Sequence, residues 1–274
     1  MPNVIAHNYE THYELDDFTD PWVKDKETIV IQHGLGRNSR FWYHWVPLLA
    51  RHYRVIRRDM RGHGQSADPG PHHAWSVDEL LTDIKGFLDA LNLDRVHFVG
   101  ESIGGLQGIA CAVRWPERFK SLTLCAGAIK IPPSIQKHFA VGYADWHTAL
   151  GALGAGGWAK ALMQGGGVAG GDLDPVRQDW IIKEWSRTPT HVMQGFSRMV
   201  PGADVTALLP QIRVPTLLLA PARSSFTPLH EQVKVRDTIP GAQIAVIDGR
   251  GHEIYVDEPE ACTAALLRFL RSLE

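Results

Sequence analysis

The sequence predicts an α/β fold: a mostly parallel central sheet with helices on both faces, interrupted by an inserted α-helical segment. Two observations predict it. Short apolar runs rich in β-branched residues alternate with longer helical patterns, and loops with unusual composition follow several of those runs. Strands that alternate with helices favour a parallel sheet. Ligands bind such sheets beyond the carboxyl ends of the strands, so these loops are the places to look for a functional site.

The individual elements follow from local patterns. The run TIVIQ at 28–32 is typical of a strand buried on both faces. The segment 76–91 predicts a helix, because Ser76 and Glu79 form a capping box at its start and apolar residues recur along one side. The remaining predicted strands are 53–58, 96–99, 121–125, 215–220 and 243–247, and the remaining predicted helices are 41–50, 105–114 and 259–273.

The alternation stops between residues 129 and 209. This segment is rich in glycine and aromatic residues and contains helical patterns without a clear strand. We therefore predict a core made of residues 1–128 and 210–274, with 129–209 as a helical insertion. The glycine-rich stretch 151–171 is interpreted as either a flexible hinge or a partly disordered loop.

Composition excludes several classes of protein. A chain of 274 residues can bury a large core, and 44% apolar with 21% charged residues excludes a disordered chain or a fibrous repeat. Twenty-eight basic against thirty acidic residues give a net charge of −2, which indicates neither a nucleic-acid partner nor an anionic membrane. We expect a small-molecule substrate, and the sequence predicts no oligomeric state.

Cysteine usage and the first residues bear on the compartment. Cys111, Cys125 and Cys262 are far apart, which fits reduced thiols better than a disulfide framework. The first twenty residues lack the pattern of a signal peptide, and no apolar run approaches the roughly 20 residues of a membrane-spanning helix. We therefore expect a soluble, cytoplasmic protein.

A serine lies at a sharp turn between a predicted strand and a predicted helix. The segment GESIG at 100–104 fits the pattern G-x-S-x-G. A serine in such a turn is held in a strained conformation with its hydroxyl exposed, and the following helix directs backbone N–H groups toward developing negative charge. Ser102 is therefore the candidate nucleophile. His252, in a glycine-flanked loop after the last predicted strand, is the candidate general base.

Together with the turn, three further motifs resemble the α/β-hydrolase family over nearly the whole chain. They are HGLG at 33–36, DMRGHGQS at 59–66 and the dipeptide Gly251-His252. The resemblance implies that 129–209 caps the active site. It also implies that the backbone N–H groups of Leu35 and Ile103 form an oxyanion hole, and that His33 shapes this loop and does not act as the base.

The acid that orients the histidine in this family is missing from both usual positions. The loops APARSSFTP at 220–228 and CAGAIK at 125–130 contain neither Asp nor Glu. Three explanations stay open. Ser102 and His252 form a dyad, with Ser224, Ser225 or a backbone carbonyl holding the imidazole; a carboxylate reaches in from elsewhere; or the protein is not a fast hydrolase. The candidate carboxylates are Asp248, Glu253 and Asp145.

The sequence favours a serine hydrolase that cleaves a small, fairly apolar ester or lactone through an acyl-enzyme on Ser102. A carbon–carbon bond hydrolase of the same fold, a cofactor-independent dioxygenase and a non-catalytic ligand receptor are the alternatives. A serine at the turn excludes relatives that need a carboxylate nucleophile, such as haloalkane dehalogenases and epoxide hydrolases. We expect no metal and no nucleotide cofactor, because the sequence contains no cluster with metal-ligand spacing, no P-loop and no G-x-G-x-x-G unit at the first helix.

Overall fold

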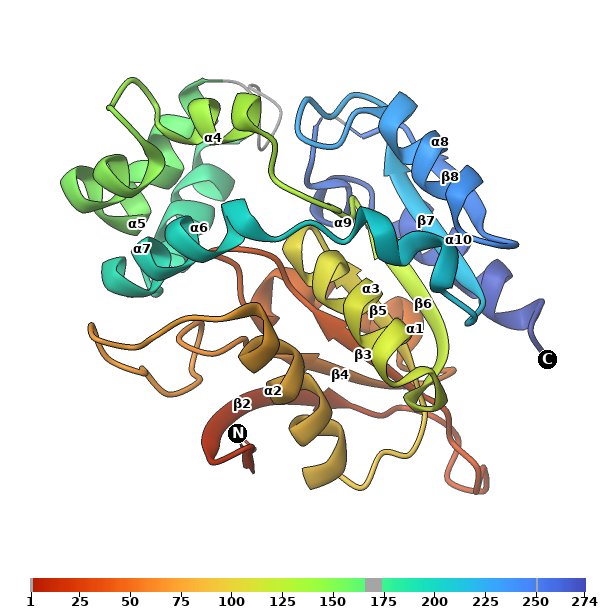
Figure 1. The fold of residues 1–274 in the computed structure, drawn as a ribbon. Helices are drawn as coiled ribbons and strands as arrows, with labels where there is room; N and C mark the ends of the chain where they lie inside the picture. Colours follow the sequence, from red (N-terminus) through yellow and green to blue (C-terminus); the bar gives the residue numbers. More distant parts are fainter. Residues whose placement is uncertain (1, 166–173, 250) are drawn as a thin grey trace.

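A mostly parallel sheet organises the chain, as the sequence predicts (Figure 1). The computed structural model describes residues 2–165, 174–249 and 251–274. Its strands are arranged in the order β1-β2-β4-β3-β5-β6-β7-β8. Their bounds are β1 Asn3–Ala6, β2 Tyr9–Asp16, β3 Thr28–Gln32, β4 Arg54–Arg58, β5 Val96–Glu101, β6 Phe119–Cys125, β7 Thr216–Pro221 and β8 Gln243–Ile247. Strands β3 to β8 pair in parallel, whereas β1 and β2 pair antiparallel at one edge.

The antiparallel edge was missing from the sequence prediction. Strand β2 buries polar residues such as Thr11 and His12 in addition to apolar ones. It therefore lacks the alternation of apolar and polar residues that indicates a strand in a sequence. His7 and Asn8 both have positive φ, of 48° and 62°, and form the two-residue connection between β1 and β2. Left-handed conformations at both positions are typical of tight hairpin turns, although glycine or Asn-Gly is the usual signal.

Helices cover both faces of the sheet. They are η1 Ser39–Trp45, α1 Val46–Leu49, α2 Val77–Ala90, α3 Ile103–Arg114, α8 Leu229–Thr238, α9 Ile254–Asp257 and α10 Pro259–Arg271, with short turns η2 Pro116–Arg118, η3 Val200–Gly202 and η4 Thr206–Gln211. Helices α2, α3 and α8 pack on one face of the sheet, and η1, α1 and α10 pack on the other (Figure 1). Among the described helices, none has both the length and the apolar character needed to cross a bilayer.

Alternate residues of the central strands enter different cores. Ile29 and Ile31 of β3 pack with η1 and α10, whereas Val30 between them packs with α2 and α3. Successive side chains of a strand point to opposite faces, and both faces are covered here. This explains why the strand reads as an unbroken apolar run.

Capping residues in the sequence predicted the start of one helix correctly. The Ser76 side chain accepts a hydrogen bond from the Glu79 backbone N–H at 3.2 Å, which confirms the predicted start of α2. The helix predicted over 41–50 is different: it begins as the 3₁₀ helix η1 and continues into the four-residue helix α1. Pro47, within the first turn of α1, lacks the backbone N–H that a continuous α-helix would use there.

Four longer helices lie between β6 and β7 and gather in one group at the side of the sheet (Figure 1). These inserted helices are α4 Pro133–Phe139, α5 Trp146–Gln164, α6 Pro175–Trp185 and α7 Thr190–Met199. The expectation of a hinge or loop from residue 151 is wrong as far as Gln164, because this stretch is helical and changes direction at Gly154, where φ is 67°. Buried Trp158 and Leu162 pack this part of α5 into the core. The last part of the predicted stretch, 166–171, lies outside the described residues.

Candidate active site

Ser102 lies between the last residue of β5 and the first residue of α3. Its φ of 51° and ψ of −118° lie in a region that side chains other than glycine rarely adopt, which is the strained turn predicted from the sequence. The turn leaves no room for a side chain at Gly104, because a Cβ there would lie 2.5 Å from the carbonyl oxygen of Gln32. The glycine therefore allows α3 to start directly against β3, with Ser102 at the end of the sheet.

His252 lies in the loop after β8, and hydroxyl groups face one nitrogen of its ring. Its Nδ1 atom is 3.4 Å from Ser224 Oγ and 3.3 Å from Thr227 Oγ1. Both hydroxyls come from the loop after β7, which is one of the two positions where the family's acid was expected. The side chains of Ser224, Thr227 and His252 are all buried. The dyad hypothesis offered Ser224 or Ser225 as the residue that holds the imidazole. The structure brings Ser224 to the ring, whereas Ser225 is exposed.

Hydroxyl groups hold a histidine differently from a carboxylate. A carboxylate only accepts hydrogen bonds, so it enforces an N–H on the nitrogen that it faces; a hydroxyl can donate or accept. Ser224 Oγ also accepts backbone N–H groups from Phe226 at 3.2 Å and Thr227 at 3.1 Å. The loop therefore positions the His252 ring but supplies no negative charge to stabilise the imidazolium.

A carboxylate does approach the other side of the imidazole, and it comes from the turn itself. Glu101, directly before Ser102, places Oε1 3.7 Å from His252 Nε2. Its Oε2 accepts the backbone N–H of Gly34 at 2.5 Å. Burial raises the pKa of Glu101 from 4.5 to about 7, although the Arg37 charge and the Gly34 hydrogen bond act in the opposite direction.

Sequence reasoning missed Glu101 because it occupies a variable position of G-x-S-x-G. One signal was available. An acidic residue at the end of a strand that is otherwise buried on both faces requires a partner, since buried carboxylates are rare without one. The other candidate acids do not contact the His252 side chain in the described residues: Asp248 pairs with a surface arginine, Glu253 with Arg37, and Asp145 caps the start of α5.

The imidazole itself is kept neutral. Burial, and then the positive charge of Arg37, lowers the pKa of His252 from 6.5 to about 3. A neutral imidazole can accept a proton, but forming the buried cation is costly. An ionised Glu101 beside Nε2 would offset part of that cost.

Leu35 and Ile103, the residues expected to form an oxyanion hole, both lie beside Ser102. Ile103 is the first residue of α3, so helix geometry gives its N–H no carbonyl partner within the helix. Leu35 follows Gly34, at which a Cβ would lie 2.9 Å from Ser102 Cβ, so this loop passes close against the turn. Leu35 also lines the same cavity as Ser102. Two backbone segments therefore converge on the serine.

The His33 side chain connects this loop to a neighbouring loop. Its Nδ1 lies 2.7 Å from the carbonyl oxygen of Gly34, and its Nε2 accepts the backbone N–H of Met60 at 2.9 Å. Accepting at Nε2 leaves Nδ1 as the donor to Gly34. Burial and the nearby His63 hold the pKa of His33 well below its usual range. The ring therefore joins the 33–36 loop to the 59–66 loop.

Ser102 and His252 line one cavity, with a volume of about 50 Å³, between the ends of the strands and the inserted helices. Its polar side chains are Arg37, Glu101, Ser102, Lys130, Thr227 and His252. The inserted helices contribute Ile135, Phe139, Trp158, Leu162 and Trp185. The lining is thus apolar on one side and carries the polar groups on the other, as in small-molecule sites.

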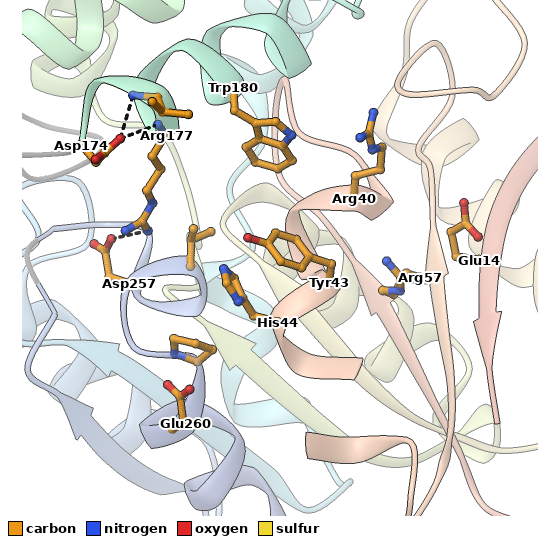
Figure 2. Close-up of a pocket in the computed structure, with 13 residues that line it drawn as sticks. Glu14, Arg40, Tyr43, His44, Arg57, Asp174, Arg177, Trp180, Asp257 and Glu260 are labelled. Carbon is orange, nitrogen blue, oxygen red and sulfur yellow. Dashed lines mark hydrogen bonds and ion pairs between the residues drawn. The ribbon is translucent and has the colours of Figure 1, made fainter. Parts of the chain in front are cut away.

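A larger cavity of about 940 Å³ opens elsewhere between η1, α6 and α10 (Figure 2). Neither Ser102 nor His252 lines it, and its arginines are engaged: Arg177 pairs with Asp257, as Figure 2 shows. Arg40 and Arg57 likewise form ion pairs. In the described ranges, no group of three or more His, Cys, Asp or Glu residues is placed to hold a metal ion. The site with the reactive groups is therefore the smaller cavity.

Comparison with known proteins identifies the family of the chain. Residues 27–148 match the model of the alpha/beta hydrolase fold family. A relative from Caulobacter sp. (strain K31), named "Putative carbamate hydrolase RutD", is 31% identical over 260 residues, which cover 90% of this chain and 91% of that protein. The 3-oxoadipate enol-lactonase 1 of Acinetobacter baylyi (strain ATCC 33305 / BD413 / ADP1) is 28% identical over 250 residues, covering 90% of this chain and 89% of the relative.

A solved structure extends the likeness to the whole fold. The crystal structure of the enol-lactonase from Burkholderia xenovorans LB400 superposes with a TM-score of 0.83 at 26% identity, covering 98% of this chain and 100% of that one. The match therefore includes the inserted helices as well as the sheet. The chain belongs to the α/β-hydrolase fold family and is a hydrolase.

Proposed function

We propose that this hydrolase cleaves a small ester or lactone through a covalent acyl-enzyme on Ser102. The observation that carries the proposal is the strained φ of 51° at Ser102, in a cavity that His252 also lines. Strain of this kind needs the surrounding structure to maintain it and is concentrated at functional sites. The two enol-lactonases among the relatives support a lactone or ester as the substrate class.

In the proposed reaction, the Ser102 hydroxyl attacks the substrate carbonyl while His252 Nε2 takes the hydroxyl proton. The backbone N–H groups of Leu35 and Ile103 stabilise the oxyanion of the tetrahedral intermediate. His252 then gives the proton to the leaving alcohol oxygen, which leaves an ester between Ser102 and the acyl group. A water molecule, activated by His252, hydrolyses that ester and restores both residues.

The inserted helices fit the role of a cap in this proposal. They supply the apolar side of the cavity, with Phe139, Trp158 and Trp185 among the contributing residues. An apolar cap excludes water and strengthens the electrostatic interactions inside. The cavity volume of about 50 Å³ favours a short acyl group.

Covalent labelling tests the nucleophile. We expect a fluorophosphonate to add one label to the purified protein, located by peptide mass spectrometry on Ser102 and absent in Ser102→Ala. His252→Ala should slow labelling by about 10²-fold or more, because the hydroxyl then lacks its base. A folded wild-type protein that stays unlabelled would overturn the proposal. Oxygen uptake that persists in Ser102→Ala would favour the dioxygenase alternative instead.

A further inference from the structure

Two hydrogen-bond donors in the cavity have no use in the proposed mechanism. Arg37, from the loop after β3, and Trp185, from α6, line the same cavity as Ser102, and each is only 4% exposed. The Arg37 guanidinium lies on the Trp185 ring, with Cζ 3.8 Å from the ring centre. The two side chains therefore form one unit, shared between the core and the inserted helices.

Two of the three nitrogen atoms of the Arg37 guanidinium have hydrogen-bond partners. Its Nη2 pairs with Glu253, and its Nε donates to the Tyr255 hydroxyl at 3.1 Å. The buried Nη1 has no hydrogen-bond partner among the described residues, and the same holds for the buried Nε1 of Trp185. Within that part of the chain, these are the cavity-lining side-chain atoms that burial leaves without a partner, and both are donors.

Buried donors without partners are costly, so their persistence beside a reactive serine points to a ligand that satisfies them. The ligand must offer oxygen acceptors, because a guanidinium and an indole N–H cannot accept. Charge favours an anion among such ligands. Lys130 also lines the cavity, while the acid that lines it, Glu101, has a pKa raised by burial to about 7 and is largely neutral below that pH.

We infer that Arg37 Nη1 and Trp185 Nε1 bind a carboxylate carried by the acyl part of the substrate. This inference rests on the proposed function and narrows it: the preferred substrate is the ester or lactone of a short dicarboxylic or oxo-dicarboxylic acid, with the second carboxylate free. Arginine is well suited to the role, since its planar fork stays charged when buried and matches carboxylate geometry. The Glu253 pair leaves Nη1 available while keeping the guanidinium in place.

Matched esters test the inference. Monoethyl succinate and ethyl butyrate have acyl groups of equal length that differ in carrying a carboxylate or a methyl group. We expect the wild-type protein to show a higher kcat/KM for monoethyl succinate, measured by acid release in a pH-stat at pH 7. We expect a preference of about tenfold or more, because a hydrogen bond between the Arg37 guanidinium and a carboxylate joins two charged groups.

Trp185→Phe removes one donor and keeps an aromatic ring beneath Arg37. The ratio of the two kcat/KM values should fall by about three- to fivefold. Arg37→Gln combined with Glu253→Gln removes the cation together with its counter-charge, and the ratio should fall further, to about one. Trp42→Phe is the matched control: Trp42 is also fully buried with an unpartnered Nε1, but it does not line the cavity, so the ratio should stay at the wild-type value.

Binding to Ser102→Ala separates this inference from the proposed chemistry. By calorimetry, monoethyl succinate should bind this variant at least tenfold more tightly than ethyl butyrate, and Trp185→Phe added to it should reduce that difference. Equal binding of the two esters, or a wild-type preference for ethyl butyrate, would overturn the carboxylate site even if Ser102 is labelled. Absent labelling with selective binding of monoethyl succinate would overturn the acyl-enzyme and leave the anion site standing.

Discussion

Oε1 of Glu101 lies 3.7 Å from Nε2 of His252, so the carboxylate that the structure brings to the imidazole is the residue directly before the serine. In a serine–histidine–acid triad, the acid binds the other ring nitrogen, Nδ1. Here Ser224 and Thr227 face Nδ1 with neutral hydroxyls. Orientation of the ring and stabilisation of its positive charge are thereby divided between two sides of the imidazole.

This division predicts an unusual pH dependence. Because the pKa of Glu101 is about 7, its carboxyl group is neutral below and negative above neutrality. A negative charge beside Nε2 stabilises the imidazolium formed in the transition state, so kcat/KM should rise about 10- to 100-fold as pH increases through 7. Glu101→Gln should remove this rise. The pKa of His252, about 3, keeps histidine ionisation away from the same range. A rise through pH 7 that survives in Glu101→Gln would contradict the assignment to Glu101.

The same carboxyl group should make folding stability depend on pH. Its pKa is raised from 4.5 to about 7 on folding, so its contribution to stability is complete below about pH 4.5 and is lost as pH rises through 7. Glu101→Gln has no such loss. The difference in unfolding free energy between variant and wild type should therefore shift in favour of the variant by about 3 kcal/mol between pH 4 and pH 8. Urea unfolding at a series of pH values measures it, and a difference independent of pH would refute the prediction.

Ser224 is the position at which a carboxylate should restore the missing charge. An aspartate there would face Nδ1 of His252 and would accept the backbone N–H groups of Phe226 and Thr227, which favour its ionised form. We expect Ser224→Asp to raise kcat by about tenfold or more. Steady-state kinetics on a neutral ester measures the change. The exposed neighbour Ser225 provides the control, since Ser225→Asp adds the same charge away from the ring and should leave kcat unchanged.

Arg37 and Glu253 should behave as a coupled pair in stability. Both are buried, and removing one partner leaves the other charge without compensation, which typically costs 3–5 kcal/mol. Arg37→Gln and Glu253→Gln should each lower the unfolding free energy by about that amount. The double variant should lose much less than the sum, as for other directly contacting pairs. Additive losses in urea unfolding would show that the pair is not energetically coupled.

The sequence by itself determined the parts of this protein that depend on local pattern. The buried strand at 28–32, the capped start of α2 at Ser76 and the strained turn at Ser102 each follow from residues that are neighbours along the chain. Periodicity, caps and glycine spacing are local, so they can be read without a structure. The alternation of such strands and helices was enough to predict the fold class, and the order of four sequence motifs indicated the family.

Only the tertiary structure decided what surrounds His252. Glu101, Ser224 and Thr227 are far from it in the sequence and meet it because parallel strands bring their carboxyl ends to one edge of the sheet. The same reason hid the unpartnered donors Arg37 and Trp185, which come together from a core loop and an inserted helix. Burial shifts the pKa values of Glu101 and His252 and leaves the donors of Arg37 and Trp185 without partners. Burial exists only once the chain has folded, so the sequence alone could not show these properties.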